Sequence, residues 1–143
     1  LSLPLFSNYH SDKARATMQF LADIIKSMEL RDYLTIDDLY AMSEREVIDW
    51  ILSCGDKTLS TAFREFQRAT SVYSSSTIKK DRYCTDVKTK IRYTIPLVQG
   101  DDETGATRIT DLSKQVDRNI KKFLEAKLPK YVGFDFEFTP YTE

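Results

Sequence analysis

The residues best suited to binding a ligand form a row of basic side chains in the second half of the chain. Between residues 79 and 92 the sequence carries six cations and only two acids. Lys88, Lys90 and Arg92 alternate with apolar residues, so in a strand their side chains lie on one face, about 7 Å apart. Arginine binds phosphate oxygens with paired hydrogen bonds and lysine supplies a point charge, and Arg108 on a short neighbouring strand can join them.

The same row has a simpler interpretation. Lysines on the outer face of an edge strand protect it from pairing with other chains. On the sequence alone, this solvated outer face is favoured over a phosphate site.

This chain lacks the combinations of residues that catalysis would need. Transition-metal sites require several converging imidazoles, thiolates or carboxylates, and the chain has one histidine, His10. A serine triad would need the same histidine, and no G-x-S-x-G turn presents a serine. The four glycines form no phosphate-binding loop. We therefore predict neither catalytic nor metal-ligating residues here.

Two groups of acids are better explained without a function. Asp37 and Asp38 stand at a predicted helix start, where carboxylates interact favourably with the backbone amides. The loop at residues 101–103 is acidic but has no EF-hand spacing.

The aromatic residues near the C-terminus could stack on bases, but core packing is favoured. Phe134, Phe136 and Phe138 alternate with acids that would repel phosphates. We expect Phe134 and Phe136 to pack towards a helix carrying Val116, Ile120 and Phe123.

Composition indicates a globular protein. Of the 143 residues 41% are apolar and 30% are charged, and the net charge of −1 gives no general attraction to nucleic acid. No run reaches the roughly 18 apolar residues of a membrane span. The isolated Cys54 and Cys84 are typical of a reducing compartment, so a cytoplasmic location is expected. The apolar start without an initiator Met suggests a piece of a longer protein.

The first half predicts four helices. Ser11 caps the first, to about residue 30, in which one apolar stripe recurs at helical spacing: Ala14, Met18, Leu21, Ile25 and Met28. Thr35 and Asp38 start a short second helix, Ser43 and Glu46 form a capping box for a third that stops at Gly55, and a fourth covers residues 58–73. Phe20 and Ile24 lie off that stripe and, with Leu3 and Phe6, predict a self-association surface and hence a homo-oligomer.

The second half predicts a small β-β-α-β unit after a linker at residues 71–77. A strand at 87–95 ends at Pro96, an acidic loop leads to a short strand at 107–110, a helix covers 111–128, and a last strand covers 132–138. The predicted fold is α+β, with a helical segment at 1–74 and the small unit at 75–143 packed as one body.

The order of these elements resembles HD-domain phosphohydrolases of the deoxynucleoside triphosphate triphosphohydrolase type. NYHSDKARATMQFLADIIKSMEL is similar to the Y-x-H-K helix that closes their catalytic domain, and IDDLYAMSEREVIDWIL and FREFQRATSVY resemble the helices that follow. KTKIRYTIPL, TRITDLSKQV and YVGFDFEF are similar to their C-terminal strands and helix. The family's metal-binding His-Asp pair is missing and would lie upstream of Leu1. Tyr9, Ser11 and the residues after Arg108 also depart from the family pattern.

The resemblance implies an accessory and assembly region that packs against an upstream catalytic domain, with a divalent metal in that domain only. It also implies phosphate or nucleotide contacts at His10 and Arg108, beside the basic strand of Lys88, Lys90 and Arg92. The alternative is a free-standing interaction module that binds an anionic partner through that strand.

Overall fold

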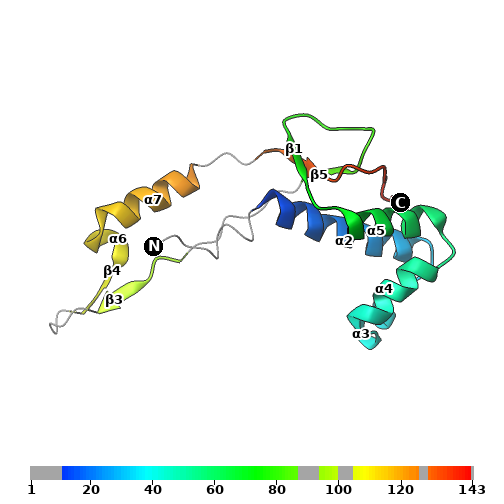
Figure 1. The fold of residues 1–143 in the computed structure, drawn as a ribbon. Helices are drawn as coiled ribbons and strands as arrows, with labels where there is room; N and C mark the ends of the chain where they lie inside the picture. The colour runs from blue at the N-terminus through cyan, green and yellow to red at the C-terminus, as the bar shows by residue number, and fades with distance from the viewer. Residues whose placement is uncertain (1–10, 87–93, 100–104, 126–128, 143) are drawn as a thin grey trace. The chain divides into compact units, whose positions relative to one another are not determined.

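The computed structural model describes residues 11–86, 94–99, 105–125 and 129–142, and these form an α+β fold (Figure 1). The chain divides into two compact units. The first combines residues 1–88 with residues 129–143, and the second is residues 89–128. This division differs from the expected boundary at residue 74, because the last described strand joins a sheet of the first unit.

The four predicted helices are confirmed: α2 (Asp12–Leu30), α3 (Ile36–Ala41), α4 (Glu44–Ser53) and α5 (Lys57–Arg68). Ser11 accepts a hydrogen bond from the amide of Ala14 at 3.1 Å and so begins α2. Complete capping boxes at Thr35 and Ser43 begin α3 and α4. The fourth helix ends at Arg68, before the predicted Tyr73, because Tyr73 belongs to a strand.

A three-stranded antiparallel sheet completes the first unit. Its strands are β1 (Tyr73–Ser75), β2 (Cys84–Thr85) and β5 (Tyr131–Gly133), with β5 in the centre. The predicted linker at residues 71–77 therefore contains β1. The predicted last strand is too long, because the chain after Gly133 bends around the peptide of Tyr83. The Phe134 amide donates to the Tyr83 carbonyl at 3.2 Å, and the Tyr83 amide donates to the Phe136 carbonyl at 2.7 Å.

The buried face of α2 is centred to one side of the predicted stripe. Ala16, Phe20, Ile24 and Met28 are buried. Met28 belongs to the predicted stripe, and Leu21 and Ile25 of that stripe are partly buried against the core, whereas its Met18 is 70% exposed. Phe20 decides the face because its ring lies at the centre of an aromatic cluster, which we call the Phe20 cluster: Phe20, Phe66, Tyr83, Phe134, Phe136 and Phe138.

Two expectations concern this core. Phe134 and Phe136 are packed as predicted, and within the first unit both rings contact Phe20 on α2, at 5.9 and 5.4 Å between ring centroids. Phe20 and Ile24 lie inside the core and cannot form a self-association surface. Leu3 and Phe6 lie outside the described residues.

In the second unit, a β-hairpin is followed by two helices. β3 (Leu97–Gln99) pairs with β4 (Ala106–Arg108). The predicted return strand at 107–110 is therefore present, but it ends at Arg108 because Ile109 begins a helix. The predicted helix at 111–128 is divided into α6 (Ile109–Leu112) and α7 (Lys114–Leu124), because Ser113 caps α7. The predicted strand at 87–95 falls mostly outside the described residues, and β3 follows Pro96 instead of preceding it.

None of the described helices is long and apolar enough to cross a membrane.

Candidate functional site

Of the five residues predicted to bind phosphate, the described part of the chain contains one. His10, Lys88, Lys90 and Arg92 lie outside it. Arg108 is the last residue of β4, lies opposite Leu97 in the hairpin and is exposed. The structure therefore places Arg108 on the surface of the second unit.

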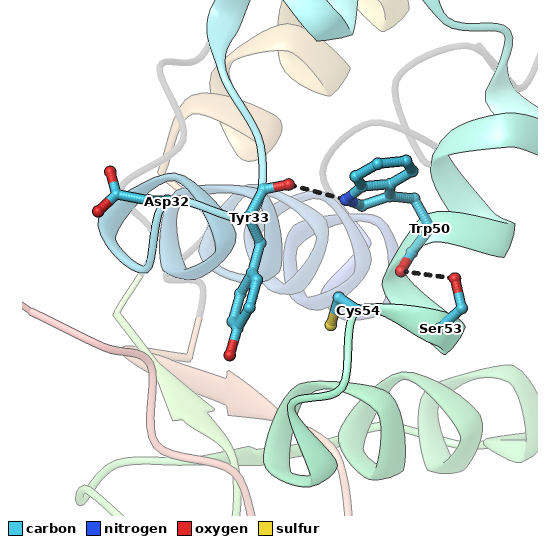
Figure 2. A pocket seen from close by; sticks show the side chains of 5 residues that line it. All are labelled: Asp32, Tyr33, Trp50, Ser53 and Cys54. Atoms are coloured by element: carbon cyan, nitrogen blue, oxygen red, sulfur yellow. Dashed lines mark hydrogen bonds between the residues drawn. The ribbon is translucent and has the colours of Figure 1, made fainter.

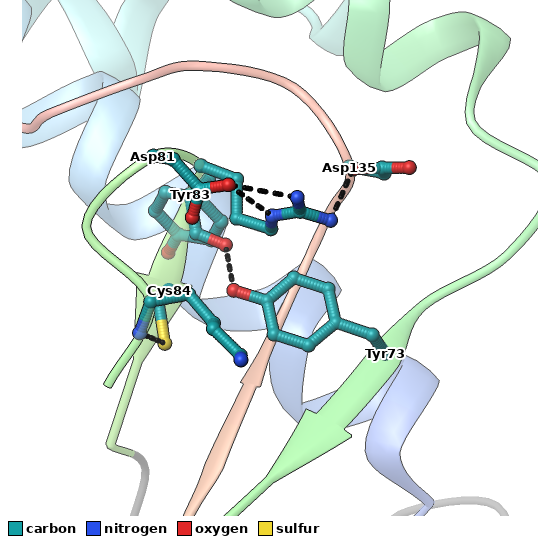
Figure 3. Close-up of polar contacts among 7 residues, drawn as sticks. Tyr73, Asp81, Tyr83, Cys84 and Asp135 are labelled. Atoms are coloured by element: carbon teal, nitrogen blue, oxygen red, sulfur yellow. Dashed lines mark hydrogen bonds and ion pairs between the residues drawn. The ribbon is translucent and has the colours of Figure 1, made fainter. Parts of the chain in front are cut away.

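Arg82, in the predicted basic stretch, is held by two carboxylates (Figure 3). Its guanidinium donates to Asp81 Oδ2 at 2.8 Å and also to Asp135, and it lies over the ring of Tyr73 at 5.7 Å. The hydrogen bond from Arg82 keeps the pKa of Asp81 below its ordinary value. Arg82 therefore ties the segment before β2 to the segment after β5, and its charge is already balanced.

The phenols of Tyr73 and Tyr83 both act as hydrogen-bond donors. Tyr73 donates to the carbonyl oxygen of Tyr83 at 3.0 Å (Figure 3), and Tyr83 donates to Asp23 Oδ2 at 2.7 Å. Burial is the main reason that the pKa of each phenol is raised; for Tyr83 the hydrogen bond to Asp23 raises it further. Neither phenol is a general base near neutral pH, so this polar group stabilises the fold.

An open cavity of about 360 Å³ lies where α2 and α4 end (Figure 2). It is lined by Asp32, Tyr33, Trp50, Ser53 and Cys54. This volume is at the lower end of the range for small-ligand sites, about 300–1,000 Å³.

The end of α2 shapes this cavity. Asp32 adopts a φ of 57°, and the amides of Asp32 and Tyr33 donate back to the carbonyls of Glu29 and Met28 at 3.0 and 2.9 Å. This is a Schellman motif with aspartate in the left-handed position. The Trp50 indole then donates to the Tyr33 carbonyl at 2.7 Å, which fixes the ring at the edge of the cavity (Figure 2).

The Ser53 and Cys54 side chains of the lining are already hydrogen-bonded to carbonyls of α4. Ser53 donates to the carbonyl of Asp49 at 2.7 Å, and the Cys54 thiol donates to the carbonyl of Ile51 at 3.4 Å, so both donors serve the end of α4. The five residues contain no nucleophile bonded to a base. Across the described ranges, no group of three or more His, Cys, Asp or Glu side chains could hold a metal ion. What the cavity offers is aromatic surface beside one carboxylate.

The sequence did not predict this cavity. Trp50 falls within the predicted third helix, and 46% of the residue is exposed. A usable signal was the helical spacing of Val47 and Ile51, which places Trp50 beside the inward face and not on it.

Comparison of the chain with family models, with curated proteins and with solved structures finds no match. The kinship with HD-domain phosphohydrolases stays a prediction.

Proposed function

We propose that this chain is the C-terminal accessory and assembly region of an HD-type phosphohydrolase that acts on a nucleotide or a related phosphate ester. In this proposal the chain supplies no catalytic residue. A separate helical domain carries the His-Asp metal site, whose divalent ion activates water for attack on phosphorus. The cytoplasm is the proposed location.

The observation that supports an assembly role is the surface of the second unit. None of the residues described there, 94–99 and 105–125, is buried. Leu97 and Leu112 are 63% and 61% exposed, and Val98 and Leu124 are also exposed. Apolar side chains left open in this way usually mark an interface.

Helix α7 has the pattern of an interface helix. Val116 and Ile120 recur at helical spacing and are half-buried, while the lysines of the same helix are exposed. A unit of 40 residues is too small to build a core of its own, since chains below about 40 residues usually need an added partner or staple. We infer that the apolar side of α7 packs on another body of the assembled enzyme.

The proposed phosphate contact is Arg108. It lies in the hairpin next to these apolar residues, and its guanidinium makes no hydrogen bond or ion pair within the described ranges. An arginine in this state can bind an oxyanion with two hydrogen bonds. His10, Lys88, Lys90 and Arg92 are proposed to contribute to the same ligand.

Three measurements test this proposal. The first is equilibrium dialysis of the full chain with dGTP, comparing the wild type with Arg108→Ala. We expect the variant to bind at least about tenfold more weakly, equivalent to about 1.4 kcal/mol. Equal binding by both proteins would remove Arg108 from the site.

The second is sedimentation of the wild type and of a Leu97→Asp/Leu112→Asp variant. The third is sequencing of the reading frame that precedes Leu1. We expect the variant to lose association and the frame to encode a His-Asp motif. A frame without that motif would end the HD-type proposal. Binding of an anionic partner that depends on Lys88, Lys90 and Arg92 would then favour the interaction module.

A further inference from the structure

The short helix pair α3–α4 carries a surface with large exposed apolar side chains. Ile36 is 57% exposed, Tyr40 is 87% exposed and Trp50 is 46% exposed. Helix α3 has no buried residue, and α4 has only Ile51. In the first unit, α3 lies at the end remote from the three-stranded sheet (Figure 1).

Helical spacing places these side chains beside acids. Ile36 and Asp37 precede Tyr40 by four and three residues, and Glu46 precedes Trp50 by four, so each set shares a helix face. We call these exposed residues of α3 and α4, together with the exposed Asp49, the acidic aromatic surface: Ile36, Asp37, Tyr40, Glu46, Asp49 and Trp50. The cavity described above opens at the Trp50 end of it, next to Tyr33 and Asp32.

The charge of this surface is one-sided. Residues 32–49 contain six acids and one cation, Arg45. Hydrogen bonds from Thr35 and Ser43 hold the pKa values of Asp38 and Glu46 below their ordinary values, so both carboxylates stay charged in mildly acidic solution. The side chains of Asp32, Asp37 and Asp49 accept no hydrogen bond from the described residues. Their charge is therefore available to a partner.

We propose that the acidic aromatic surface docks a lysine- or arginine-rich peptide segment of another protein, whose large apolar side chain enters the cavity beside Trp50. Charge complementarity selects the partner. A nucleic acid or an anionic lipid would be repelled by the same carboxylates, whereas a basic segment is attracted before contact. The rigid indole, fixed by its bond to Tyr33, supplies the kind of anchor that dominates peptide interfaces.

This inference does not depend on the HD-type proposal. It uses residues of the first unit only, and Arg108 and the second unit play no part in it. Failure of the nucleotide measurement above would leave it intact.

The experiment is a selection of random displayed peptides on the immobilised full chain, followed by affinity measurement with synthetic copies of the enriched peptides. Three variants are compared with the wild type. Tyr40→Ala removes a residue that is 87% exposed, so the fold is preserved. Asp32→Asn/Asp37→Asn/Asp49→Asn removes charge while asparagine still suits the positive φ of residue 32. Ile78→Ala, at 56% exposed and outside the surface, is the matched control.

We expect the enriched peptides to combine Lys or Arg with a large apolar residue. Binding should weaken by about tenfold or more in Tyr40→Ala and in the asparagine variant, and should be unchanged in Ile78→Ala. Added salt should weaken wild-type binding as well.

Three outcomes would overturn the proposal. The first is enrichment of acidic or uncharged peptides, and the second is equal binding by all four proteins. The third is association of the chain with itself that Tyr40→Ala abolishes, which would assign the surface to a second copy.

Discussion

Tyr83 and Asp23 are joined by a hydrogen bond of 2.7 Å from the phenol to Oδ2, although 60 residues separate them in the chain. The same carboxylate group accepts a second bond, from Gln19 at 2.7 Å. Tyr83 is 1% exposed, and its ring meets Phe20 edge to face at 5.1 Å. This pair therefore connects α2 to the segment before β2 through both a polar and an aromatic contact.

Replacing Tyr83 with Phe should lower the free energy of unfolding by about 1.5–3 kcal/mol, the range for a hydrogen bond to a charged group. The ring contacts remain, so the loss measures the bond itself. Urea denaturation gives the value, and Tyr40→Phe at an exposed position is the control. A change below about 0.5 kcal/mol, the usual range for surface substitutions, would show that Asp23 finds another donor.

Alkaline pH should destabilise the protein through the same phenol. The folded-state pKa of Tyr83 is raised above the unfolded value of about 10, chiefly by burial. Its contribution is therefore complete below about pH 10 and is lost as the pH rises above it, because the unfolded chain releases its proton first. Thermal melts from pH 8 to 11 should show a fall above about pH 10 that is shallower in Tyr83→Phe. Identical slopes in both proteins would contradict this prediction.

Phe20→Ala should lower the free energy of unfolding more than any other single truncation in the Phe20 cluster. Phe20 is fully buried at its centre, so about 3–5 kcal/mol is expected. Phe136 is only half-buried, so Phe136→Ala should lower the free energy of unfolding by about 1.5–3 kcal/mol. Chemical denaturation of both variants checks the order. An equal loss in the two variants would contradict this order.

Gly133→Ala should disrupt the sheet. A Cβ at this position would lie 1.9 Å from the carbonyl oxygen of Tyr83, a backbone atom that cannot turn aside. We expect a loss of at least about 1–3 kcal/mol, as for overpacked cores, or failure to fold. Ser74→Ala on the neighbouring strand β1 is the control, since its side chain is exposed. Circular dichroism melts that coincide for the two variants would be inconsistent with this close approach.

The helix starts could be predicted from sequence because a cap needs only residues three apart. Thr35 with Asp38 and Ser43 with Glu46 carry the whole signal locally. The inward face of α2 could not be predicted in this way. Both candidate stripes have helical spacing, and the choice depends on rings far away in the chain, such as Phe134.

The burial of Tyr83 and the presence of the cavity could not be predicted from the sequence, for related reasons. Tyr83 stands between Arg82 and Cys84 in a charged stretch, which is typical of a surface loop. Its burial follows from the paired peptides of Phe134 and Phe136. The cavity depends on Asp32 adopting a positive φ, a position where sequence patterns favour glycine or asparagine.

The central position of β5 has a consequence for the order of folding during synthesis. Among the described residues β1 and β2 each pair with β5 alone, and the second unit is encoded between β2 and β5. A ribosome therefore makes both outer strands well before the strand that joins them. Pairing between distant segments is slow because the loop must close first. The nascent chain can form α2 to α5 early, but the sheet must wait until Gly133 has left the exit tunnel.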